Sequence, residues 1–389
     1  MKTAIVLGMG VNGLGVSRGL GRQGIEVYGI EQKDDIAFSS KYCKKGYVFP
    51  YPVTYPEECL NQCIELGKSL GDKAVLLPTS EPYVAFISKF RTELSHYFLF
   101  NIPESSILEN ILDKSKQYQL AANLGIPVPK TISPKHIDDL KEGLISYPAI
   151  IKGLDSKQWS YAFNNKGFIA CCYNDLLEYF RLALDKNVEV VIQEMITGPA
   201  KNNFSFYAYY SKEKELLAIC SHQSIRRFPV DMGMPTYHIS GNYPEPIALG
   251  RKFFEGLGYT GAGNIQFKYD DRDGQLKLIE LNPRFGMMNM LATYAGVNFP
   301  YINYLDCIGE KVIPSLTFKE NIRWLHAVDD VRSFWANRKR GDTSFTEWVK
   351  SILSANCFAY YARDDLKPVC KHYASVAERS LKRIFGLKT

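Results

Sequence analysis

The stretch NIQFKYDDRDGQLKLIELNPRFG, residues 264–286, constrains the fold of this chain more than any other segment. Two runs of alternating apolar and polar residues flank DDRDG, a pattern that predicts an antiparallel β-hairpin. Successive side chains of a strand point to opposite faces, so Glu280, Asn282 and Arg284 project from one side. A loop of roughly three to five residues places Gln266 opposite Glu280 or within one residue of it.

This row of polar side chains suits a divalent cation next to a phosphate group. Glu280, Asn282 and Gln266 offer oxygen atoms, and Asp270 lies near the turn. Mg²⁺ prefers oxygen ligands and keeps several waters, so a few protein ligands suffice when it bridges substrate phosphates. The guanidinium of Arg284 matches a phosphoryl group or a carboxylate. The alternative interpretation is a hairpin whose outer face is only solvated.

The order of apolar runs predicts three parts. Short apolar runs alternate with helical segments over the first hundred residues, which is typical of a small parallel βαβ sheet. One long helix is expected over 105–125, and strands in two antiparallel clusters follow it. We therefore expect an α/β N-terminal domain, an α+β two-lobed domain and a helical C-terminal extension. The expected boundaries are 1–110, 111–315 with lobes of about 111–190 and 191–315, and 316–389.

Composition excludes several classes of protein. The chain of 389 residues is 46% hydrophobic and carries a net charge of only +6, so it has material for a core and offers no case for nucleic acid as its partner. Nine scattered cysteines form neither a disulfide framework nor a zinc pattern, and the first apolar run is too short for a signal peptide or a membrane span. We expect a cytoplasmic protein with reduced thiols.

Two points stay open from composition. The basic tail ERSLKRIFGLKT allows peripheral contact with an anionic membrane surface or packing on its own domain, and a homodimer is also open.

Further segments suit a nucleotide. Lys114 lies on the predicted helix, and Lys152 ends the apolar strand PAIIK. The strand VVIQEMITG runs apolar up to Gln193 and Glu194 and then meets a glycine, as in a linker between two lobes where backbone groups could bind adenine. Each feature has a plainer interpretation, namely a solvated lysine at a strand end or a buried strand that exits to solvent.

Taken in order, four motifs are similar to the ATP-grasp superfamily. They are DKS at 113–115, AIIKG at 149–153, VIQEMITG at 191–198 and the hairpin at 265–286. The resemblance is to the branch of carboxylate-amine ligases that includes D-aspartate ligase, and it extends to the first domain and nearly the whole chain.

The resemblance implies ATP and Mg²⁺ as cofactors and gives each motif a role. For the nucleotide, it implies that Lys114 and Lys152 hold phosphates and that Gln193, Glu194 and the backbone of Met195 and Ile196 hold adenosine. For the metal and the reaction, it implies that Glu280 and Asn282 bind Mg²⁺, that Arg284 steadies an acyl phosphate and that Arg226 lies near the acceptor. It also implies that Ser156, Trp159 and Lys166 belong to a mobile phosphate loop. Three departures stand out: Gln266 replaces the usual acidic ligand, the loop lacks a glycine cluster, and Ser224 replaces a basic residue.

The function that follows from the resemblance is ATP-dependent ligation of a small-molecule carboxylate to an amine through an acyl phosphate. Two alternatives remain. Gln266 and the glycine-poor loop would also fit a non-catalytic ATP-binding module. The turn GMGVNG, with Gly8, Gly10 and Gly13 followed by Glu31, spells a dinucleotide fingerprint and would fit an NAD-dependent oxidoreductase.

Overall fold

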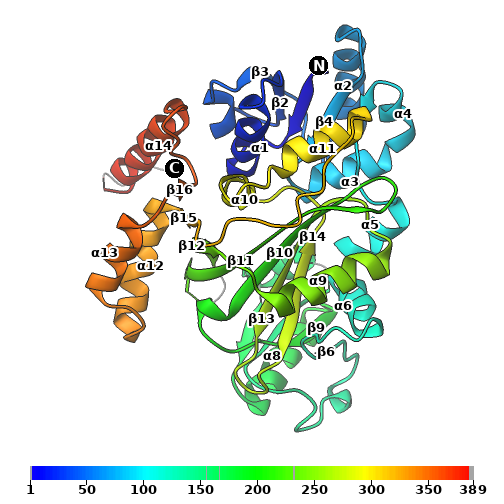
Figure 1. Ribbon diagram of the computed structural model, residues 1–389. Helices are drawn as coiled ribbons and strands as arrows, with labels where there is room; N and C mark the ends of the chain where they lie inside the picture. The colour runs from blue at the N-terminus through cyan, green and yellow to red at the C-terminus, as the bar shows by residue number, and fades with distance from the viewer. Residues whose placement is uncertain (1, 155, 166, 231–232, 385–389) are drawn as a thin grey trace.

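The computed structural model describes the whole chain except residues 1, 155, 166, 231–232 and 385–389, and the side chains of 156–157, 380 and 383–384. Three sheets follow one another along the chain, with most of the C-terminal helices to one side of the central sheet (Figure 1).

The N-terminal sheet has five parallel strands in the order β3-β2-β1-β4-β5, which confirms the parallel βαβ prediction. Its strands are β1 (Ala4–Leu7), β2 (Val27–Glu31), β3 (Cys43–Val48), β4 (Ala74–Pro78) and β5 (Phe98–Leu99). Its helices are α1 (Val11–Gly21), η1 (Ile36–Ser39), α2 (Pro56–Ser69), α3 (Glu81–Lys89) and α4 (Arg91–Ser95). After β3 the chain returns to the other side of β1, so the strand order reverses between β1 and β4.

The expected long helix over 105–125 is two helices, α5 (Ser105–Leu112) and α6 (Lys114–Asn123). Asp113 separates them in an extended conformation, and its side chain accepts hydrogen bonds from the N–H groups of Ser115 and Lys116. An aspartate that caps a new helix start satisfies donors that would otherwise be orphaned. The prediction of one helix was wrong because the apolar spacing continues across this cap.

The small lobe is built on a four-stranded sheet in the order β6-β9-β7-β8. Its elements are β6 (Thr131–Ile132), η2 (Ile137–Asp139), β7 (Ala149–Gly153), α7 (Ser156–Phe163), β8 (Phe168–Ala170), α8 (Tyr173–Asp185) and β9 (Val190–Glu194). Trp159, Leu176 and Phe180 pack with Ile151 and Ile192 to form its core.

The central sheet has seven strands in the order β14-β13-β10-β11-β12-β15-β16. Its elements are η3 (Ala200–Asn202), β10 (Asn203–Tyr210), β11 (Leu216–Phe228), β12 (Met234–Ser240), α9 (Pro244–Leu257), β13 (Gly261–Tyr269), β14 (Leu276–Asn282), β15 (Arg323–Leu325) and β16 (Cys357–Phe358). Gln266 pairs with Glu280, which confirms the expected hairpin register.

The two faces of the central sheet differ in character. One face is apolar: Phe206 and Ile265 pack in one cluster with Phe253 of α9. On the other face Tyr207 and Trp324 belong to the core that the sheet shares with the N-terminal domain. Gln266 and Glu280 are partly exposed on their strands. This alternation along each strand is what leaves a polar row for a site.

The C-terminal segment is joined to both earlier parts. Helices α10 (Asn289–Tyr294) and α11 (Phe299–Ile308) precede it, and its own helices are α12 (Ala327–Arg340), α13 (Phe345–Leu353) and α14 (Lys367–Ile384). The expected extension 316–389 supplies strands β15 and β16 to the central sheet. Arg18 of α1 forms a buried ion pair with Asp365, 3.0 Å between Nε and Oδ2, so this segment is also fixed to the N-terminal domain.

Candidate active site

Glu280 is the centre of the polar row. Its Oε1 accepts hydrogen bonds from Gln266 Nε2 and Asn282 Nδ2, both at 3.1 Å, and its Oε2 lies 3.3 Å from Lys114 Nζ. Burial raises the pKa of Glu280, but the charge of Lys114, together with Asn282 and Arg284, outweighs burial and leaves the pKa below its ordinary value. Glu280 is therefore a carboxylate at neutral pH.

The donor set fits Mg²⁺. One carboxylate flanked by two amide groups provides oxygen ligands, and the Glu280 side chain keeps 29% of its surface exposed. Such a set leaves room for waters and phosphate oxygens, as Mg²⁺ requires. The amide of Gln266 donates to Glu280 in this arrangement, so its carbonyl oxygen would need to turn to become a ligand.

Arg284 joins the polar row to the N-terminal domain. Its Nη2 donates to Asn282 Oδ1 at 3.0 Å and lies 3.5 Å from Glu81 Oε1 at the start of α3. The backbone next to it is tightly packed, because a Cβ added to Gly286 would stand 2.1 Å from Tyr207 Oη. Sequence reasoning missed Glu81, since more than two hundred residues separate it from Arg284.

Lys114 and Lys152 come from different elements and approach the same space. Lys114 begins α6 and contacts Glu280, whereas Lys152 lies on β7 of the small lobe. Burial and, secondarily, the charge of Lys114 lower the pKa of Lys152. Within the described residues, Lys152 Nζ makes no hydrogen bond or ion pair. Two neighbouring ammonium groups, one of them without a counter-ion among the residues that the structure describes, favour a polyanionic ligand between the lobes.

The linker after β9 is held by the protein itself. Glu194 accepts from the backbone N–H groups of Lys130 at 3.3 Å and Ser146 at 3.1 Å, and Met195 N–H donates to Pro148 O. The Glu194 carboxylate, expected to help hold adenosine, is thus already engaged. Gln193 Nε2 donates to Thr131 Oγ1 and Ile196 O accepts from Lys268 Nζ, which leaves the second lone pair of that carbonyl for a ligand.

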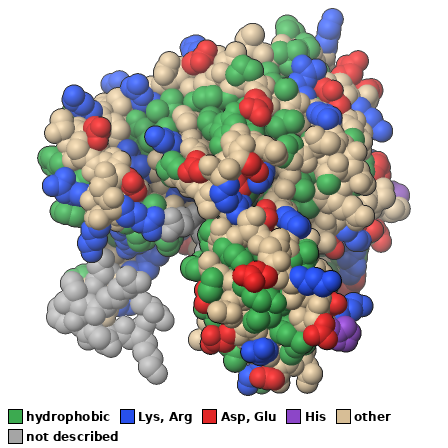
Figure 2. All heavy atoms as spheres, turned by 90° about the horizontal axis from the view of Figure 1, so that it is seen from below, with side chains coloured by type: hydrophobic (Ala, Val, Ile, Leu, Met, Phe, Trp, Pro, Cys, Tyr) green, Lys and Arg blue, Asp and Glu red, His purple; other side chains and the backbone are tan. Residues whose placement is uncertain are grey.

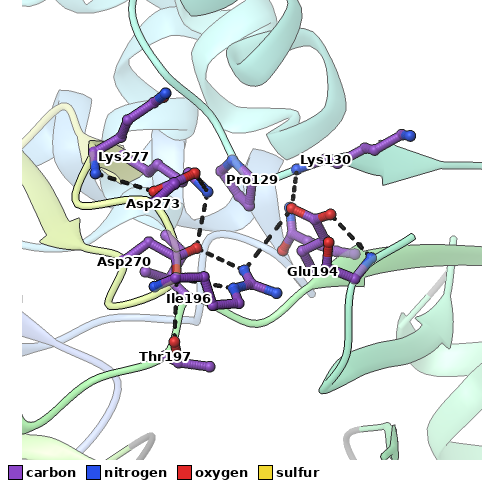
Figure 3. Close-up of polar contacts among 12 residues, drawn as sticks. Pro129, Lys130, Glu194, Ile196, Thr197, Asp270, Asp273 and Lys277 are labelled. Atoms are coloured by element: carbon purple, nitrogen blue, oxygen red, sulfur yellow. Dashed lines mark hydrogen bonds and ion pairs between the residues drawn. The ribbon is translucent and has the colours of Figure 1, made fainter. Parts of the chain in front are cut away.

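The hairpin turn is fixed to this linker (Figure 3). Asp270 is fully buried and accepts from Arg272, from Lys277 at 2.8 Å and from Thr197 Oγ1 at 3.1 Å. Burial raises the pKa of Asp270, but Arg272 and Lys277 outweigh burial and hold the pKa well below its ordinary value. Arg272 Nη2 also lies 3.9 Å from Glu194. The network sets where the linker passes over the central sheet.

The segment expected to form a mobile phosphate loop contains helix α7. Trp159 is buried in the small-lobe core, and its Nε1 donates to Asn165 Oδ1 at 2.9 Å. The Ser156 side chain and Lys166 lie outside the described residues. The absence of a glycine cluster in this segment agrees with a helix.

Two neighbouring arginines on β11 turn in different directions. Arg226 donates from Nε and Nη2 to the carboxylate of Asp330 in α12, at 2.9 and 2.8 Å. Arg227 donates to Asn203 Oδ1 at 2.9 Å. Burial lowers the pKa of Arg227, and the negative charge of Glu280 offsets part of this decrease. Arg227 therefore lies in the field of Glu280, whereas Arg226, expected near the acceptor, pairs with Asp330.

The glycine turn after β1 is closed by an acidic side chain. Glu31 accepts from Met9 N–H at 3.0 Å and from Gln32 N–H at 2.8 Å. Gly13 is needed for packing, because a Cβ there would stand 2.1 Å from Gly8 O. A carboxylate that already occupies this turn repels a pyrophosphate, so the turn favours a packing role over dinucleotide binding.

Charge is unevenly spread over the surface. Seen from below, Lys and Arg side chains gather on the left, where α12 to α14 lie in Figure 1, and both signs mix elsewhere (Figure 2). The basic sequence NRKRGD, residues 337–342, spans the C-terminal end of α12. Across the described residues, no helix combines the length and the apolar character that a membrane crossing needs.

Comparisons with known proteins agree with this geometry. A family model described as "ATP-grasp in the biosynthetic pathway with Ter operon" matches residues 238–328. D-aspartate ligase of Enterococcus faecium is 25% identical over 340 residues, which cover 82% of this chain and 79% of the relative.

Solved structures show the same fold. The L-amino acid ligase of Bacillus licheniformis matches with a TM-score of 0.59 at 16% identity, over 79% of this chain and 74% of its own. The biotin carboxylase domain of the Hydrogenobacter thermophilus 2-oxoglutarate carboxylase, solved with MgADP, matches with a TM-score of 0.62 at 18% identity, over 83% and 73%. The motifs, the sheets and these matches agree in their similarity to ATP-grasp proteins.

Proposed function

We propose that this protein is an ATP-dependent ligase that joins a carboxylate to an amine through an acyl phosphate. The observation that carries the proposal is the convergence of Glu280, Asn282 and Arg284 with Lys114, while Lys152 approaches from the other lobe. The similarity to D-aspartate ligase over most of the chain supports the same reaction class.

The residues divide between nucleotide and metal. Lys114 and Lys152 would hold the phosphates, and Ile196 O with the adjoining linker would bind adenine. Glu280 and Asn282 would hold Mg²⁺, with Gln266 as a neutral third ligand. Bound Mg²⁺ would supply positive charge against the negative charge of the transferred phosphoryl group.

The chemistry needs no side-chain nucleophile. The substrate carboxylate attacks the terminal phosphorus of ATP while Lys114, Lys152 and Arg284 offset the charge that spreads over the phosphoryl oxygens. ADP is displaced from the transferred phosphoryl group, and an acyl phosphate forms. An amine then attacks the acyl carbon and displaces phosphate. Because Asp330 holds Arg226, we assign the developing oxyanion to Arg284.

An ADP-release screen tests this proposal. Wild-type protein is mixed with ATP, Mg²⁺ and pairs drawn from a panel of amino acids, hydroxy acids and simple amines. Glu280→Ala should reduce ADP release by about a hundredfold or more, since it removes the one carboxylate of the metal site. Glu255→Ala is the matched control, because Glu255 is exposed on α9 and forms an ion pair with Arg251.

Two outcomes would contradict the proposal. If Glu280→Ala releases ADP as fast as wild type, the metal assignment is wrong. If ATP-Mg²⁺ raises the melting temperature but no mixture releases ADP, the chain is a nucleotide-binding module without ligase activity.

A further inference from the structure

The N-terminal domain places a carboxylate beside the proposed reaction centre. The strand order reverses between β1 and β4, and ligands of open parallel sheets bind at the carboxyl ends of the strands where this happens. Thr79 follows β4 and donates to Gly8 O at 2.8 Å, so the two strand ends meet. Phe285 N–H donates to Pro78 O, which brings the segment after β14 to the same strand ends.

Glu81 is a half-exposed carboxylate at this place, and it also pairs with Arg284. Its side chain is 48% exposed, and its one contact within the described residues is Arg284, at 3.5 Å. The other acidic groups near this edge are committed. Glu31 accepts from Met9 N–H and Gln32 N–H, Asp35 accepts from Ile36 N–H, and Asp34 pairs with Lys371.

The charges around Arg284 explain why such a carboxylate is needed. Lys114, Lys152 and Arg284 are cations, and Glu280 is already bound to Lys114, Gln266 and Asn282. An amine substrate arrives near neutral pH as an ammonium ion, which these cations repel. A carboxylate beside the acyl carbon would offset this repulsion.

We propose that Glu81 binds the ammonium group of the amine substrate and accepts its proton, an inference that rests on the proposed ligase function. The R–NH₃⁺ group gives one proton to Glu81 and becomes R–NH₂. The nitrogen lone pair forms a bond to the acyl carbon, and the carbon–oxygen bond to phosphate breaks with its electron pair leaving on phosphate. The departing phosphate takes the second proton, and Glu81 returns the first to water.

Hydroxylamine separates this role from the earlier steps, because it is uncharged near neutral pH and needs no base. Wild type, Glu81→Gln and the control Glu255→Gln are given ATP, Mg²⁺, the acid panel and either hydroxylamine or amino acids as the amine. Hydroxamate is read by its iron colour and amide by mass spectrometry. Glu81→Gln should keep hydroxamate formation within about threefold of wild type but lose amide formation by about a hundredfold, the scale of a missing general base.

The pH profile gives a second readout. Amide formation by Glu81→Gln should rise about tenfold per pH unit between pH 7 and 9, in step with the fraction of free amine, while wild type changes little. Equal loss of hydroxamate and amide would overturn the inference, because Glu81 would then only position Arg284. Amide formation at the wild-type rate would overturn it as well. If wild type makes no hydroxamate with any acid, the ligase proposal itself fails.

Discussion

Removal of the Asp330 carboxylate should destabilise this protein strongly. It is fully buried, and its carboxylate accepts from Arg226 Nε and Nη2, from Thr236 Oγ1 at 2.8 Å and from Trp348 Nε1 at 2.9 Å. These four hydrogen bonds join β11, β12, α12 and α13. Asp330→Ala leaves the Arg226 guanidinium buried without a counter-ion, which typically costs about 3–5 kcal/mol.

Urea unfolding followed by tryptophan fluorescence measures this cost. Asp329→Ala is the matched control, because the neighbouring Asp329 is partly exposed, pairs with Arg332 and His326, and should lose less than about 1 kcal/mol. The double variant Arg226→Met, Asp330→Leu should recover most of the loss, since apolar side chains replace both charges. The reasoning is refuted if Asp330→Ala unfolds within about 1 kcal/mol of Asp329→Ala.

Three further predictions follow from single contacts. Burial lowers the pKa of His222 to about 3 and that of His238 well below its ordinary value. The unfolded chain therefore binds more protons below about pH 6.5, and the free energy of unfolding falls from there toward pH 3. Replacing both histidines by Gln should flatten the decline in melting temperature between pH 7 and 5, and an unchanged decline contradicts this prediction. Asp113→Ala should destabilise the protein by about 1 kcal/mol and weaken ATP binding in a thermal-shift titration, whereas Asp113→Asn, which still caps α6, should do neither. Gly286→Ala should lower the melting temperature, because the added Cβ contacts Tyr207 Oη. Adding Tyr207→Phe should restore the melting temperature, because the atoms next nearest to that Cβ lie 3.4 Å away. Failure of this rescue would show that the backbone there needs glycine for another reason.

Local patterns predicted the parts of the site that lie on one hairpin. The register of Gln266 with Glu280 and the common side of Glu280, Asn282 and Arg284 follow from the period of two in a strand and from a short turn. The same period fails on β11. Register shifts lie between Ser224 and Arg226 and again after Arg226, and a bulge re-aims every side chain that follows it.

The sequence by itself determined the strands, the parallel N-terminal sheet and the polar row, because each depends on residues a few positions apart. Only the tertiary structure decided that Asp330 holds Arg226, that the backbone N–H groups of Lys130 and Ser146 bind Glu194, and that Glu81 reaches Arg284. These partners lie between 48 and 203 positions apart, and such pairs form only when whole sheets and helices pack together. Periodicity carries no information about which distant segment will complete a site.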